Sequence, residues 1–115
     1  MNDFTDVKLE IFIPQGYVDQ VREALAKVGV GVIGKYDHCF AVSEVQGSFR
    51  PLEGASPFDG KVGEITYSVE YKLEVNCRRG LVEEAVAAVR RSHPYEEPLI
   101  NVIPLANHLF DMRKK

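Results

Sequence analysis

One segment past the middle of the chain has the clearest structural period. Between Tyr67 and Val75 every second residue is apolar, and the residues between them are polar or charged. Successive side chains of a β-strand point to opposite faces, so this period predicts a strand with one packed face and one charged face. A sheet built from such strands is covered on one side only.

The other periodic segments place this strand in a repeated order. Alternating residues predict further strands over 7–13, 37–45 and 99–105, and apolar residues spaced by three and four predict amphipathic helices over 18–28 and 81–91. The resulting order is strand, helix, strand, long loop, strand, helix, strand. Two split βαβ units in tandem indicate an α+β, ferredoxin-like βαββαβ sandwich, with a four-stranded antiparallel sheet and both helices on one face.

Length and composition limit the class of protein. A chain of 115 residues, 45% apolar and 27% charged, is expected to form a single soluble domain over 1–105, followed by a surface extension over 106–115 that ends in a solvated basic tail. A net charge of -3 argues against a general nucleic-acid binder, and neither a membrane span nor a signal peptide is recognisable. The two cysteines, Cys39 and Cys77, have no CxxC partner, which favours free thiols in the cytoplasm.

The sheet face opposite the helices has no cover within this plan. Phe12, Phe40 and Val42 are expected to add apolar surface to that face. A bare and partly apolar sheet face usually finds a partner, so we expect a homo-oligomer.

Two loops between the periodic segments contain the candidate functional residues. The loop from 47 to 60 has three glycines, two prolines and two aromatic residues, with neither helical nor strand periodicity. Long ordered loops in compact domains are often functional or interfacial. The loop from His93 to Pro98 combines two prolines with an imidazole, a phenol and two adjacent carboxylates. Each proline fixes its own φ and restricts its predecessor, so this loop should be stiff.

Both loops carry long sequence motifs. Residues 47–60 contain G-S-F-R-P, then G-A-S-P-F and a closing glycine, and residues 93–98 read H-P-Y-E-E-P. With Gly34-Lys35-Tyr36-Asp37 also similar, the chain from about 7 to 105 resembles the inserted domain of the YqfO-like proteins. These are dinuclear-metal-centre hexameric proteins, often named GTP cyclohydrolase I type 2 homologues. The chain resembles a free-standing copy of that insert.

The resemblance implies a fold more than an activity. The insert of the full-length proteins is similar to the trimeric CutA and P-II signalling proteins, so a P-II/CutA-like fold and a trimer are expected. The resemblance implies that the residues of the two-metal centre belong to the halves on either side of the insert, so none of them is expected to map onto a position here. One departure stands out: Ile100 and Asn101 occur where the family commonly has Tyr-Asp.

The two motif loops supply a candidate ligand-binding or interface site. In a trimer, the long loop of one subunit is expected to face the second loop of its neighbour and form a cleft between subunits. The planar fork of Arg50 suits a carboxylate or a phosphate. Alternatively, Arg50 pairs with Glu53 or Glu97 and only fixes the loop as an interface. The predicted site residues are Phe49, Arg50, Glu53, His93, Tyr95, Glu96 and Glu97.

The predicted function is a non-catalytic, oligomeric sensing or adaptor domain that binds a small molecule or an ion at subunit interfaces. No nucleophile with a neighbouring base and no phosphate-binding glycine turn after a strand is recognisable, which argues against an enzyme. The alternative is a metal-dependent hydrolase or metal-binding protein, with a divalent ion held by His93 and Glu96 or Glu97. Expected partners are further copies of the chain and a small-molecule ligand, and neither nucleic acid nor a membrane.

Overall fold

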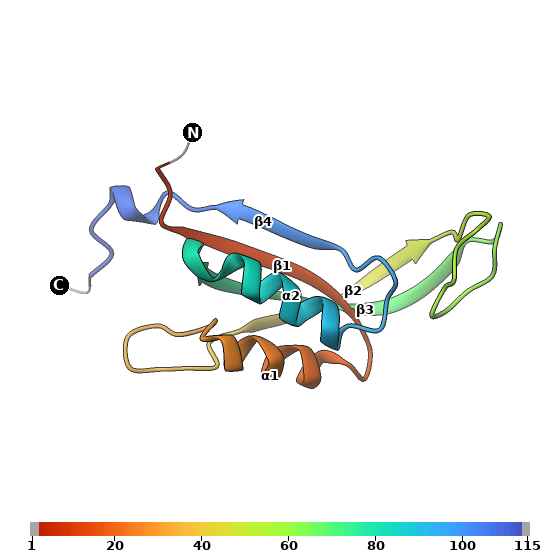
Figure 1. The fold of residues 1–115 in the computed structure, drawn as a ribbon, viewed down its shortest axis with the longest axis horizontal. Coiled ribbons are helices and arrows are strands. Elements are labelled where there is room, and N and C mark those ends of the chain that lie inside the picture. Colours follow the sequence, from red (N-terminus) through yellow and green to blue (C-terminus); the bar gives the residue numbers. More distant parts are fainter. Residues whose placement is uncertain (1–2, 114–115) are drawn as a thin grey trace.

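The chain folds into a four-stranded antiparallel sheet with two helices packed on one face, as the sequence predicts (Figure 1). The computed structural model describes residues 3–113. The strand order is β2-β3-β1-β4, which is the ferredoxin-like arrangement. The elements are β1 (Asp6–Pro14), α1 (Val18–Val28), β2 (Ala41–Phe49), β3 (Thr66–Arg78), the 3₁₀ turn η1 (Arg79–Leu81), α2 (Val82–Ser92), β4 (Ile100–Pro104) and the 3₁₀ turn η2 (Asn107–Leu109).

The ends of the helices follow from local residue chemistry. Helix α1 stops at Gly29, whose φ of 98° is the left-handed conformation that glycine adopts without a steric penalty. The amide of Gly29 donates to the last carbonyls of the helix. In α2, acidic residues occupy the first turn and Arg90 and Arg91 the last, which suits the helix dipole.

The core lies between the sheet and the two helices. Four alternate residues of β1 are fully buried and pack against buried residues of both helices and of β3. The central members of this core are Val7, Leu9, Ile11, Ile13, Val21, Leu25, Leu73, Val75, Ala85 and Val89. Burial of this stripe holds the body of the molecule together. None of the helices within residues 3–113 is long and apolar enough to cross a membrane.

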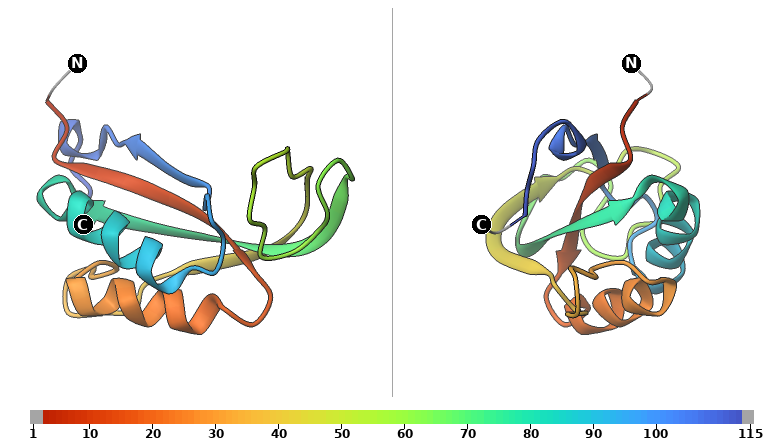
Figure 2. Two further views of the ribbon diagram at one scale, coloured as in Figure 1. Left: turned by 45° about the vertical axis from the view of Figure 1, so that its right-hand side comes forward. Right: turned by 90° about the vertical axis from the view of Figure 1, so that its left-hand side faces the viewer.

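The β2–β3 hairpin projects beyond the helices (Figures 1 and 2). The two strands pair from Ala41 opposite Glu74 to Phe49 opposite Thr66. The helices cover only the proximal part of β3, so Leu73 and Val75 are buried while Tyr67 and Val69 are 68% and 45% exposed. Residues 50–65, which we name the distal loop, connect the two strands at the far end.

Strand β2 is shifted along the chain relative to the prediction. It begins at Ala41 instead of residue 37, and it continues through Gly47 to Phe49, which the sequence pattern assigned to the loop. Residues 37–40 instead fold back on the turn after α1: the amide of Cys39 donates to the carbonyl of Gly31 at 2.8 Å, and His38 has a positive φ of 54°. These local bonds take the place of strand pairing there.

The sheet face opposite the helices is more polar than predicted. Lys8 forms ion pairs on this face with Glu10, at 3.7 Å, and with Glu74. Of the three apolar residues expected on this face, only Phe12 points to it, because Phe12 alternates with Ile11 and Ile13, which point into the core. Val42 pairs with Leu73 of the core and therefore points to the helix side, and Phe40 packs against the core itself.

The terminal residues 1–2 and 114–115 of the predicted domain and extension lie outside the described residues.

Candidate functional site

The two motif loops meet within one chain. The ring of Tyr95 lies 6.1 Å from that of Phe49 and 6.0 Å from that of Phe58, centroid to centroid. The amide of Ser56 donates to Oε1 of Glu96 at 3.2 Å. The sequence predicts that these loops face each other across a subunit boundary, whereas the hairpin brings them together without a second copy.

His93 fixes the loop that follows α2. Its amide donates to the carbonyl of Val89 at 2.8 Å, and its side chain is buried at 6% exposure. Nδ1 accepts a hydrogen bond from the amide of Tyr95 at 3.1 Å, and Nε2 lies 2.6 Å from the carbonyl oxygen of Phe12. Since Nδ1 accepts, the proton sits on Nε2, which donates to Phe12. Burial lowers the pKa of the imidazole, so the neutral form is favoured and His93 acts as a clamp between loop and strand.

Tyr95 connects this loop to the hairpin. Its hydroxyl donates to Oε2 of Glu70 on β3 at 2.8 Å. Burial, together with that carboxylate, raises the pKa of Tyr95 well above its usual range, so the phenol stays protonated. Gly47, on the neighbouring strand, makes room for this pair, because a Cβ at position 47 would overlap the Glu70 carboxylate. The glycine of the first motif therefore leaves space for the Glu70 carboxylate, and the tyrosine of the second motif donates a hydrogen bond to it.

A cavity of about 570 Å³ lies between the distal loop and the loop from His93 to Pro98. Its apolar wall includes four aromatic rings, those of Phe12, Phe49, Phe58 and Tyr95. Its charged residues are Arg50, Asp59, Glu70, Glu96 and Glu97. A volume of this size, with a largely apolar wall and a few polar groups, is typical of small-molecule sites.

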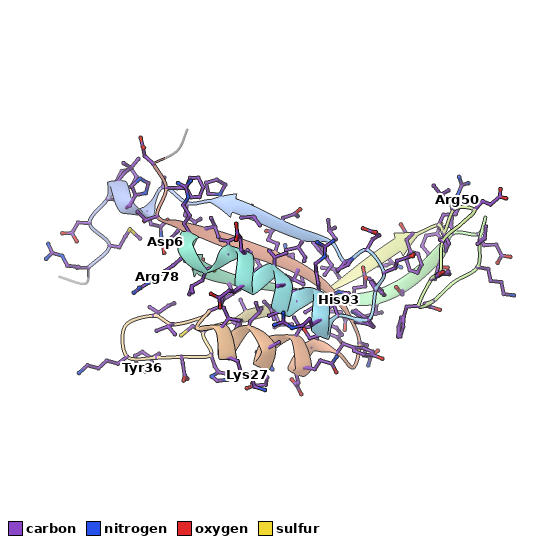
Figure 3. All side chains as sticks on the ribbon, viewed as in Figure 1. Asp6, Lys27, Tyr36, Arg50, Arg78 and His93 are labelled. Atoms are coloured by element: carbon purple, nitrogen blue, oxygen red, sulfur yellow. The ribbon has the colours of Figure 1, made fainter. Side chains whose placement is uncertain are left out.

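The structure gathers most of the predicted site residues around this cavity. Phe49, Arg50, Tyr95, Glu96 and Glu97 line it. Glu53 and His93 do not. Figure 3 shows Arg50 at the distal end of the hairpin and His93 beside the end of α2.

Arg50 makes no ion pair with Glu53, with Glu97 or with any other residue between 3 and 113. The pairing that would have made it a purely structural residue is therefore not seen in this chain. Its guanidinium stands at the outer end of the cavity, in an exposed loop.

Glu70 is the site residue that the sequence did not single out. It belongs to the charged set that alternates with the apolar stripe from Tyr67 to Val75, and in that set it resembles the other solvent-facing residues. One feature of the sequence points to Glu70: the neighbouring strand carries a glycine, Gly47, and a glycine leaves space for a carboxylate on the adjacent strand. The pairing register that makes them neighbours became clear only from the fold.

The predicted metal ligands do not form a cluster. Within residues 3–113, no group of three or more His, Cys, Asp or Glu side chains is placed to hold a metal ion. Both ring nitrogens of His93 are already used in hydrogen bonds. His38 lies between Glu23 and Asp37, at 3.1 Å from each, and these hydrogen bonds raise its pKa. Cys39 and Cys77 are free thiols.

The strand order and the two helices on one face define a protein of the CutA and PII-like fold class. The PII-like protein CutA from Nostoc sp. PCC 7120 superposes with a TM-score of 0.65 at 17% identity, over 90% of this chain and 85% of that one. At that identity the likeness shows the fold alone. A Bacillus cereus protein related to NIF3 matches with a TM-score of 0.79 at 34% identity, over 90% of this chain and 26% of that one.

Sequence similarity points to the same group. The GTP cyclohydrolase 1 type 2 homolog of Halalkalibacterium halodurans is 46% identical over 100 residues, which are 87% of this chain and 27% of the relative. No family model matches the chain. The chain is thus a homologue of one segment of the GTP cyclohydrolase 1 type 2 homologues. It spans about a quarter of the length of the curated relatives it matches.

Proposed function

We propose that the chain is a non-catalytic, homo-oligomeric sensing or adaptor domain that binds a small molecule in the cavity between its two motif loops. One observation supports this above all: two motif loops that lie far apart in the sequence converge on one cavity of about 570 Å³. Stiff, motif-rich loops around a largely apolar cavity are typical of binding sites. The proposal places the protein in the cytoplasm, consistent with its two free thiols.

The proposal of an oligomer rests on the hairpin. Tyr67 and Val69 continue the apolar stripe of β3 past the helices and are left largely exposed. Further apolar side chains of the distal loop, Leu52, Phe58, Val62 and Ile65, are at least half exposed. A projecting arm with this much apolar surface favours contact with another copy. The resemblance to the CutA and P-II proteins favours a trimer.

Light scattering at micromolar concentration tests the oligomer. We expect a mass near three times that of the chain, and a shift toward the monomer when Tyr67 and Val69 are both replaced by serine. The matched control is Val32→Ser, an exposed valine in the turn after α1, which should leave the mass unchanged. A strict monomer for the unaltered protein would refute the oligomeric part of the proposal.

A ligand screen tests the cavity. Thermal shifts with nucleotides, small organic acids, amines and divalent ions are compared between the unaltered protein and Ala55→Phe, which places a ring inside the cavity that Ala55 lines. The matched control is Ala106→Phe, at an exposed position outside the cavity. The proposal expects at least one compound whose shift is lost in Ala55→Phe and kept in Ala106→Phe. If every shift is the same in both variants, the cavity is not a binding site.

A further inference from the structure

We propose that the cavity selects an organic cation: an ammonium or guanidinium group carried on an apolar body. The inference rests on the proposed function, because it assigns a ligand class to the same cavity. It differs from the expectation drawn from Arg50 alone, which was an anion.

The charges around the cavity favour a cation. Four carboxylates line it, those of Asp59, Glu70, Glu96 and Glu97, against the single guanidinium of Arg50. Arg50 also stands at the distal end of the hairpin (Figure 3), away from the loop that holds Tyr95. A cleft lined mainly by one sign of charge attracts the opposite sign and repels its own. An anion would meet one cation and four negative groups.

The aromatic residues favour the same class of ligand. Phe12, Phe49, Phe58 and Tyr95 all line the cavity, and the Tyr95 ring lies 6.1 Å from the ring of Phe49 and 6.0 Å from the ring of Phe58. The negative face of an aromatic ring attracts ammonium and guanidinium groups, and several rings around one site recognise organic cations. The rings also provide the apolar wall that the body of such a ligand would contact.

Glu70 is the anchor that we assign to the cationic group. Tyr95 holds Oε2 of its carboxylate at 2.8 Å, while Oε1 accepts no hydrogen bond from any residue between 3 and 113. Gly47 leaves the space that this oxygen occupies. A carboxylate that lines the cavity, held in place by a neutral phenol and with one oxygen unused next to Gly47, is suited to accept a charge-assisted hydrogen bond from an N–H donor.

Three compounds of nearly equal shape and different charge test the assignment. Tryptamine carries an ammonium group at neutral pH, tryptophol is neutral, and indole-3-acetate carries a carboxylate. Binding is followed by titration of the ¹⁵N-labelled chain, using amide shifts of residues 45–59 and 93–99. We expect tryptamine to bind about tenfold more tightly than tryptophol, the size expected for one charge-assisted hydrogen bond, and indole-3-acetate to bind most weakly.

Two variants locate the effect. Glu70→Gln keeps an acceptor for Tyr95 but removes the charge, so the tenfold preference for tryptamine over tryptophol should disappear. The matched control is Glu53→Gln, which removes the same charge from the distal loop at a residue that does not line the cavity, and the preference should remain. Gly47→Ala, which displaces the Glu70 carboxylate, should reproduce the loss seen in Glu70→Gln.

The outcomes separate the two proposals. Tight binding of indole-3-acetate that depends on Arg50 would overturn the cation assignment and leave the binding function standing. Equal binding of all three compounds, or binding by none of them, would also overturn the assignment. Whether the cavity binds any ligand is decided independently by the screen with Ala55→Phe.

Discussion

The two halves of strand β3 have the same sequence pattern and very different surroundings. In the proximal half, Leu73 and Val75 are buried against the helices, whereas in the distal half Tyr67 and Val69 are mostly exposed. The helices end before the hairpin does (Figure 1). The alternating pattern therefore defines which side of the strand is apolar, and the length of the covering helices decides whether that side is core. The proximal half supports the fold, and the distal half presents surface.

The largest expected difference between the two halves is in stability. Val75→Ala should lower the free energy of unfolding by about 2 kcal/mol, because Val75 is 3% exposed and its truncation leaves a cavity in the core. Measured at a protein concentration at which the subunit is monomeric, Val69→Ala, on the same side of the same strand, should cost less than about 0.5 kcal/mol, because this side chain is 45% exposed in the single subunit. Both changes remove the same atoms and the same strand propensity. Urea unfolding measures the two values, and equal losses would show that the distal half is also part of the core.

The body of the molecule is the part that could be predicted from sequence. The alternation of Val7, Leu9, Ile11 and Ile13 and the three- and four-residue spacing of the helices are local signals, and they match the buried residues. The end of α1 at Gly29 is equally local. The predicted ends of β1, α1 and α2 lie within two residues of the ends in the structure.

The distal region depends on information that the local pattern does not contain. The sequence places the start of β2 too early, because the hydrogen bond from the amide of Cys39 to the carbonyl of Gly31 competes with strand pairing and such a turn has no periodicity to detect. The convergence of the motif loops depends on the register of β2 and β3, which brings Gly47 beside Glu70. The motifs identify Gly47 and Tyr95 as unusual residues, but only the fold shows that both contact the carboxylate of Glu70.

The second expected effect concerns the joint between body and hairpin. His93→Gln should lower the free energy of unfolding at pH 7.5 by about 2 kcal/mol, because two hydrogen bonds of a buried ring are lost. Urea titrations of both proteins give the value. A loss as small as that of Val69→Ala would mean that the loop is not held by its histidine.

The same variant has a defined pH dependence. The pKa of His93 is lowered in the folded state by burial, so below the unfolded value of about 6.5 the unfolded chain binds a proton that the folded chain does not. The stability that His93 contributes is therefore complete above pH 6.5 and shrinks as the pH falls. His38 provides the contrast, since its hydrogen bonds to Glu23 and Asp37 raise its pKa. Its contribution is present at low pH and is lost as the pH rises.

The smallest expected effect is the most specific to the distal half. Tyr95→Phe keeps the ring between Phe49 and Phe58 but removes the hydroxyl that donates to Glu70, at a cost of about 1 kcal/mol. We expect faster hydrogen exchange at the amides of 46–49 and 66–70, with no change in β1. The matched control is Tyr67→Phe, which removes an exposed hydroxyl from the same hairpin.

Hydrogen exchange separates local from global loosening in this comparison. If Tyr95→Phe accelerated exchange equally in β1 and in the β2–β3 hairpin, the phenol would stabilise the whole fold. The hairpin would then not be a separate, less stable part of the molecule. If exchange changed only in the hairpin, the hydrogen bond between Tyr95 and Glu70 would couple the hairpin to the loop after α2. A ligand that contacts Glu70 would then be expected to change hydrogen exchange in the same hairpin amides.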